Sequence, residues 1–307
     1  MLIFKKLLFA PLVLASFISL IYLAAPITKS YDLIFSLSSN ILITLISISI
    51  LISFSSLLFI LLAAIAQDWR ISIPVATIGS VVPFLFMDFS LAVIFAAGIF
   101  LSLLLANLNL NMALKSYLNF QSSSLLGPSI KRLSGLLILT ICIVYFFSAG
   151  KIISQNGFQI PDALIETALN FAPLPESTSQ TKQVILPQLL PEQIDLLKKN
   201  PEFLEQSGLD PKLLDSLNQP QSFKASQDLT HDLIKQAVKD QIQDFIKPYI
   251  NFVPAVLAVL LFVTLQSFTS LANLLIYPLL WLTFFILEKT GFVKFEVEQR
   301  SVRKMVV

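Results

Sequence analysis

Carboxylate pairs one helical turn apart are the clearest candidates for chemistry in this sequence. Glu192 precedes Asp195 by three residues, and Glu202 precedes Glu205 by the same spacing. Two such carboxylates can act as a general acid and base, or hold a calcium ion. Each pair also follows a proline, as acids in the first turn of a helix do, where they stabilise the helix dipole. We therefore interpret both pairs as helix starts.

The other residue types that could react stand alone. His231, the one histidine, has no second histidine or cysteine near enough in sequence to suggest a metal site. The one cysteine, Cys142, lies within a long apolar run, which favours a packing role. The sequence contains no phosphate-binding glycine loop and no basic patch with interleaved aromatic residues. It predicts a protein that is not an enzyme, with no catalytic, cofactor or metal residues and no nucleic-acid partner.

Composition indicates that the lipid bilayer is the main solvent and partner of this chain. Of its 307 residues 55% are hydrophobic and 13% are charged, against about a quarter charged in soluble proteins. Charge is concentrated between residues 150 and 247, which hold nine lysines and thirteen acids. The fold class predicted is all-α: a polytopic helical membrane protein of about six transmembrane helices with a small helical extracytoplasmic insert.

The charge-free runs define the predicted spans, because a crossing helix needs about 17–25 apolar residues. Membrane domain 1–149 contains five spans, and the insert covers 150–247. A final membrane segment, 248–288, is either kinked at Pro278 or followed by an interfacial helix, and residues 289–307 form a basic tail. The five spans are 7–25, 41–66, 71–87, 90–106 and 133–149.

Asp88 divides the third predicted span from the fourth. A charge at the bilayer centre costs at least about 2.5–3.5 kcal/mol, so a turn at Met87 to Phe89, with Asp88 capping the next helix, is favoured. The alternative is an intramembrane proton or cation site at Asp88. It ranks second because no basic residue lies within the apolar runs.

Lysine and arginine near the span ends predict sidedness by the positive-inside rule. With six spans, most of the basic residues near span ends fall on one side of the membrane. They are Lys5, Lys6, Arg70, the basic residues of the loop from Lys115 to Arg132, and those of the tail. Both termini are therefore expected in the cytoplasm of a multi-pass cell-membrane protein, and residues 150–247 outside. The alternative, a seventh span, would move the tail outside.

Three proline-headed cassettes spaced ten residues apart, at Pro191, Pro201 and Pro211, predict short helices within the insert. Their apolar faces either pack on one another, which is favoured because so small a domain has little apolar surface to spare, or dock a protein partner or a second copy. The candidate docking residues are Ile194, Leu197, Phe203, Leu204, Leu213, Leu214 and Leu217.

The function predicted is interaction or assembly through this insert, without catalysis. The alternative is an oligomeric transporter or channel with a path lined by hydroxyl and amide groups, for which Gln266 and Asn273 form a candidate polar membrane patch. An enzyme acting on lipid-linked substrates is a third hypothesis, and it would need an interfacial carboxylate such as Asp68, Asp88 or Glu288.

Overall fold

The computed structural model describes residues 9–31, 39–66, 68–116, 121–158, 165, 239, 242–243 and 246–293. The chain divides into two compact units, one formed by residues 1–159 with 249–307 and the other by residues 160–248. Nearly all of the second unit lies outside the described residues, including the three cassettes and every candidate docking residue. The basic tail from residue 294 onward also lies outside them.

The first unit is built from helices alone in its described part, which confirms the all-α prediction. Helix α2 (Ala10–Ala24) continues into the 3₁₀ helix η1 (Ala25–Lys29), and α3 (Ser39–Ala66) follows. Helix α4 (Trp69–Val81) continues into η3 (Val82–Leu85). Then come α5 (Phe89–Ser116), α6 (Ser122–Asn156), and η4 (Lys247–Phe252) leading into α12 (Val253–Lys289).

Five of these helical segments are long and apolar enough to cross a membrane: α2 with η1, α3, α5, α6, and η4 with α12. They contain 20 to 43 residues and have mean hydropathies of 2.0 to 2.6. The sixth segment, Trp69–Leu85, is apolar but shorter. By length and composition the chain is therefore a multi-pass membrane protein with five spanning candidates and one short apolar helix.

Several helices extend beyond the spans predicted from charge. Helix α5 continues to Ser116 instead of ending at 106, and α6 begins at Ser122 and includes Lys131 and Arg132. Helix α12 is continuous through Pro278 and does not separate into a second helix. A charged side chain marks where apolar surface ends, whereas backbone hydrogen bonding can continue past it because long basic side chains reach solvent.

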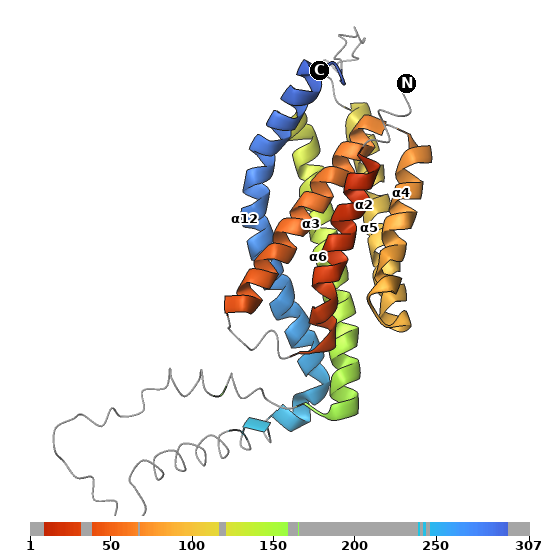
Figure 1. Ribbon diagram of the computed structural model, residues 1–307. Coiled ribbons are helices and arrows are strands. Elements are labelled where there is room, and N and C mark those ends of the chain that lie inside the picture. The colour runs from red at the N-terminus through yellow and green to blue at the C-terminus, as the bar shows by residue number, and fades with distance from the viewer. Residues whose placement is uncertain are drawn as a thin grey trace, which may run out of the picture. The chain divides into compact units, whose positions relative to one another are not determined.

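Successive segments run in alternating directions (Figure 1). Two contacts bring together the start of α5, the end of α6 and the start of α12 at one end of the unit. Asp88, just before α5, pairs with Lys151 near the end of α6. Gly150 of α6 lies beside Pro254 of α12, since a Cβ built on the glycine would be 4.0 Å from Pro254 Cγ. At the other end the rings of Phe9 and Phe292 meet edge to face at 6.2 Å between centroids. The start of α2 and the end of α12 thus lie at the same end of the unit.

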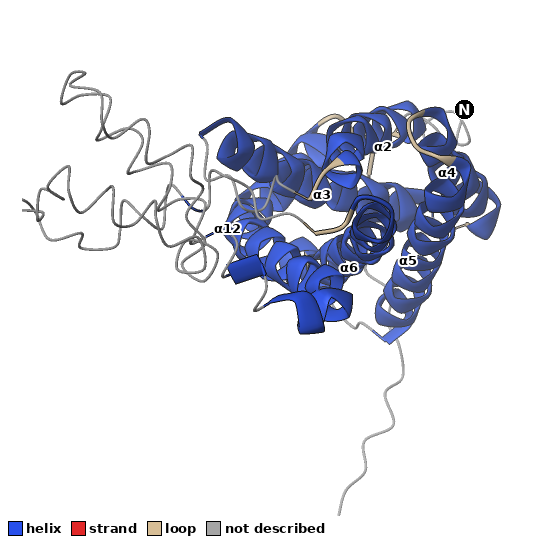
Figure 2. Cartoon of the chain, turned by 90° about the horizontal axis from the view of Figure 1, so that it is seen from below, coloured by secondary structure: helices blue, strands red, loops and turns tan. Residues whose placement is uncertain are grey.

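Helix α3 provides the centre of the core. Every residue from Ser55 to Ala64 is buried, which is the pattern of a helix surrounded on all sides. Helix α12 packs on α6 and α3, whereas α4 packs on α5 and α2. Seen along the helices, α12 and α4 lie on opposite sides of the unit (Figure 2).

Small residues allow α5 and α6 to approach closely. Gly98 and Ser102 are one turn apart on α5, and a Cβ built on Gly98 would clash with Thr140 Cγ2 of α6. The hydroxyls of Ser102 and Thr140 are 3.3 Å apart. This small-xxx-small contact with an interhelical hydrogen bond is typical of helices that pack within membranes.

Candidate functional site: an apolar groove between α3 and α12

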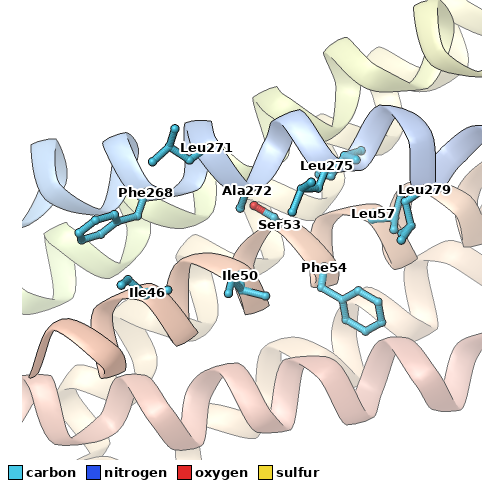
Figure 3. Close-up of a pocket in the computed structure, with 11 residues that line it drawn as sticks. Ile46, Ile50, Ser53, Phe54, Leu57, Phe268, Leu271, Ala272, Leu275 and Leu279 are labelled. Carbon is cyan, nitrogen blue, oxygen red and sulfur yellow. The ribbon is translucent and has the colours of Figure 1, made fainter. Parts of the chain in front are cut away.

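A groove of about 480 Å³ separates the outer faces of α3 and α12. Ten of its eleven lining residues are apolar, and the exception is Ser53 (Figure 3). Helix α3 contributes Ile46, Ile50, Ser53, Phe54 and Leu57, and α12 contributes Phe268, Leu271, Ala272, Leu275, Ile276 and Leu279. A surface of this kind suits an acyl chain or an apolar helix face.

Ser53 is the one polar side chain in the groove wall, and its hydroxyl lies near Ala272 of α12 in Figure 3. The side chain is 4% exposed, and its oxygen makes no hydrogen bond with any described residue. The hydroxyls of Ser55 and Ser56 on the same helix are also buried without a partner among the described residues, whereas Ser49 Oγ donates to the Leu45 carbonyl at 2.9 Å. An unpaired buried hydroxyl costs about 1–3 kcal/mol, so Ser53 lowers the stability of the α3–α12 contact rather than offering a group to an occupant of the groove.

Two more polar side chains are buried without a complete set of partners on α12. Thr269 and Asn273 are one turn apart, and neither Thr269 Oγ1 nor Asn273 Oδ1 has a hydrogen-bond partner in the described part of the chain. Both belong to the stripe that α12 turns toward the bundle. That stripe recurs every four residues, at Leu257, Leu261, Leu265, Thr269 and Asn273.

The two residues of the predicted polar patch lie in different surroundings. Asn273 is 6% exposed and belongs to the buried stripe, whereas Gln266 is exposed. Gln266 follows Leu265, which is on the stripe, and so points about 100° away from it around the helix. The described structure therefore does not assemble this pair into one lining.

Asp88 lies in the turn predicted for it. Helix η3 ends at Leu85, α5 begins at Phe89, and the Asp88 carbonyl accepts a hydrogen bond from the Ala92 N–H at 2.8 Å. The carboxylate forms an ion pair with Lys151 Nζ at 3.4 Å. Side chains this exposed, 72% for Asp88 and 47% for Lys151, gain at most about 1 kcal/mol from pairing.

The basic partner of Asp88 is a residue that sequence reasoning missed. Lys151 is 63 positions away and belongs to the charged segment assigned to the insert. The sequence does contain a signal for this ion pair, because Asp88 directly precedes one charge-free run and Lys151 directly follows another. An antiparallel hairpin of α5 and α6 brings those two run ends together.

Within the described ranges, no three His, Cys, Asp or Glu residues lie close enough to hold a metal ion. Cys142 is a buried free cysteine of α6. The chain matches no family model, no curated protein and no solved structure.

Proposed function

We propose that this is a membrane interaction or assembly protein that crosses the bilayer six times and presents residues 150–247 to a protein partner outside the cell. Helix α4 with η3 is the sixth crossing in this proposal. At about 1.5 Å per α-helical residue and 2.0 Å per 3₁₀ residue, Trp69–Leu85 spans about 27 Å, close to a hydrocarbon core of about 30 Å. Its exposed apolar residues, such as Ile78 and Val81, suit contact with lipid.

Basic side chains support the assignment of sides. Five described lysines or arginines lie on the end of the first unit where α2 starts and α12 ends: Arg70, Lys115, Lys131, Arg132 and Lys289. On the opposite end the described lysines are Lys29, Lys151 and Lys247, and Lys151 is paired with Asp88. This excess favours the first end as cytoplasmic.

Aromatic residues mark the same end as a membrane interface. Trp69 begins α4 and is 42% exposed, and Trp281, near the end of α12, is 63% exposed. Trp281 stacks on Phe285 at 5.6 Å between ring centroids, and Lys289 Nζ lies 5.8 Å from the Phe285 ring centre. Amphipathic rings with adjacent cations are typical of the headgroup region.

The observation that carries the interaction proposal is where the insert joins the helices. The chain leaves after α6 and returns at η4, next to the end where Gly150 lies beside Pro254. Two adjacent attachment points allow a segment of this length to form a domain without disturbing the bundle. In the sequence, the three proline-headed cassettes of this acidic segment are the pattern that we assign to partner binding.

Cross-linking in intact cells tests this function on the full-length chain. We expect residues 150–247 to cross-link to a specific protein, and the double substitution Leu213→Ser and Leu214→Ser to reduce the yield about tenfold, since one or two buried apolar anchors dominate most interfaces. Leu12→Ser, at a 53% exposed position of α2, is the control and should leave the yield unchanged. A yield unaffected by the cassette substitutions would refute docking through these leucines.

The unpaired polar atoms of Ser53, Thr269 and Asn273 favour one other function, transport along a polar path beside α3 and α12. Solute flux through the purified protein in vesicles that Asn273→Leu abolishes would replace the interaction proposal with this one.

A further inference from the structure

An exposed seam runs along one face of α12, with side chains at alternating spacings of three and four residues. It consists of Val256, Val259, Val263, Gln266 and Ser270. The valines are 56%, 60% and 55% exposed, and Gln266 and Ser270 are exposed as well. None of the five lines the groove with α3. Alternating three and four is the spacing by which two helices pack side by side.

Gln266 lies within the apolar depth of this unit. It is twelve residues from Pro254 and eleven from Tyr277, and each of these two contacts α6. Pro254 lies beside Gly150, and a Cβ built on Gly127 would be 2.7 Å from Tyr277 Cε1. Because α6 runs antiparallel to α12, these contacts put Gln266 level with about Ile138, inside the charge-free stretch 133–150 of α6. It is about 18 Å along the helix from the Pro254 level and about 8 Å from the level of Leu133.

The side-chain amide of Gln266 has no hydrogen bond to another residue in the part of the chain that the structure describes. In hydrocarbon, water does not supply the missing partner, and an unsatisfied amide costs several kcal/mol. Acyl chains carry no hydrogen-bonding group at the bilayer centre. A protein partner with a polar group at the same depth would supply the hydrogen bond that Gln266 lacks.

We propose that a second copy of this chain covers the seam, with the two α12 helices parallel and their Gln266 amides hydrogen-bonded to each other. This rests on the proposed function and names the partner within the bilayer. A two-fold axis along the membrane normal keeps every residue level with its counterpart. Each glutamine amide offers both donors and an acceptor, so the pair satisfies itself.

The remaining seam residues fit this packing. The small Ser270 allows the two helices to approach closely. A single polar residue in an apolar seam also fixes the register of two helices. The seam ends at Ser270 because the next positions, Asn273 and Tyr277, are occupied by the bundle itself.

Disulfide cross-linking of the full chain in native membranes tests this pairing. In a Cys142→Ala background, Val263→Cys and Ser270→Cys should each give a covalent dimer on mild oxidation. Leu275→Cys, five residues beyond Ser270, is the control, since it is 71% exposed but lines the groove on another face of the helix. It should give little dimer.

A second substitution tests whether the Gln266 amides hold the two α12 helices together, or whether the helices only come close enough to cross-link. Gln266→Leu in the Val263→Cys chain should lower the dimer yield about tenfold at equal protein density, the size expected of an interhelical hydrogen bond in membranes. Leucine suits lipid, so this variant keeps its fold. Equal yields at residues 263 and 275, an unchanged yield with Gln266→Leu, or a cross-link to a different protein would each overturn the proposal.

Failure of this pairing can be told apart from failure of the proposed function. If Gln266→Leu abolishes the dimer and the insert still cross-links to its partner, dimer formation is confirmed as a separate property. If no dimer forms but the insert partner is captured, the seam proposal is wrong and the interaction function stands. Loss of both in the unmodified chain would contradict both.

Discussion

Leucine in place of Gly98 is expected to separate α5 from α6 and lower the stability of the protein by about 3 kcal/mol, the upper range for overpacking a tight interface. No space exists for the new side chain, since even a Cβ at this position would clash with Thr140. Moving the helices apart would also break the contact of 3.3 Å between the Ser102 and Thr140 hydroxyls. Thermal unfolding in detergent, followed by size-exclusion chromatography, measures the loss.

Gly135→Leu is the matched control for this change. Gly135 is on α6, and a Cβ built there meets nothing within 4 Å. Glycine to leucine has the same effect on helix propensity at both sites, so the control removes that contribution. We expect the Gly135 variant to unfold at or above the temperature of the unmodified protein. Equal destabilisation of the two variants would show that the close α5–α6 contact is wrong.

Truncation of Phe59 to alanine is expected to cost about 3 kcal/mol or more, the lower limit for such a cavity in a well-packed core. Phe59 is 0% exposed and lies on the central helix α3, within the stretch that is buried on all sides. Helices in lipid are held together chiefly by packing, so a void in the centre loses contacts that lipid cannot replace.

Phe54→Ala, five residues earlier on the same helix, provides the comparison. Phe54 is 44% exposed and borders the groove, so its truncation should change stability by less than about 1 kcal/mol. The same unfolding assay compares the two variants. A larger loss at Phe54 than at Phe59 would mean that α3 faces the opposite way in the bundle.

The helical content and the position of most turns could be predicted from the sequence, because the bilayer requires long charge-free helices and places charges at their ends. Asp88 is the best example, since the cost of burying one carboxylate was enough to predict the turn before α5. Helix lengths were less predictable. Lys131 and Arg132 end the apolar surface of α6, but nine residues before Lys131 are already helical.

The features of the groove could not be predicted, because they depend on which faces of α3 and α12 meet. Ser53 resembles Ser47 and Ser49 in the sequence, and only packing distinguishes its unpaired hydroxyl from theirs. Gln266 and Asn273 were grouped because they are close in sequence. Their burial differs because the buried stripe of α12, which recurs every four residues, includes Asn273 but not Gln266.

Cysteine labelling in intact cells tests the central claim, that six crossings leave the tail inside and residues 150–247 outside. The two probes are Ser301→Cys in the tail and Ser179→Cys in the insert, each in a Cys142→Ala chain, treated with a membrane-impermeant maleimide. We expect Ser179→Cys to be labelled at once and Ser301→Cys only after the cells are permeabilised. Labelling of Ser301→Cys from outside would contradict it, because the short helix from Trp69 to Leu85 would then not complete an even number of crossings.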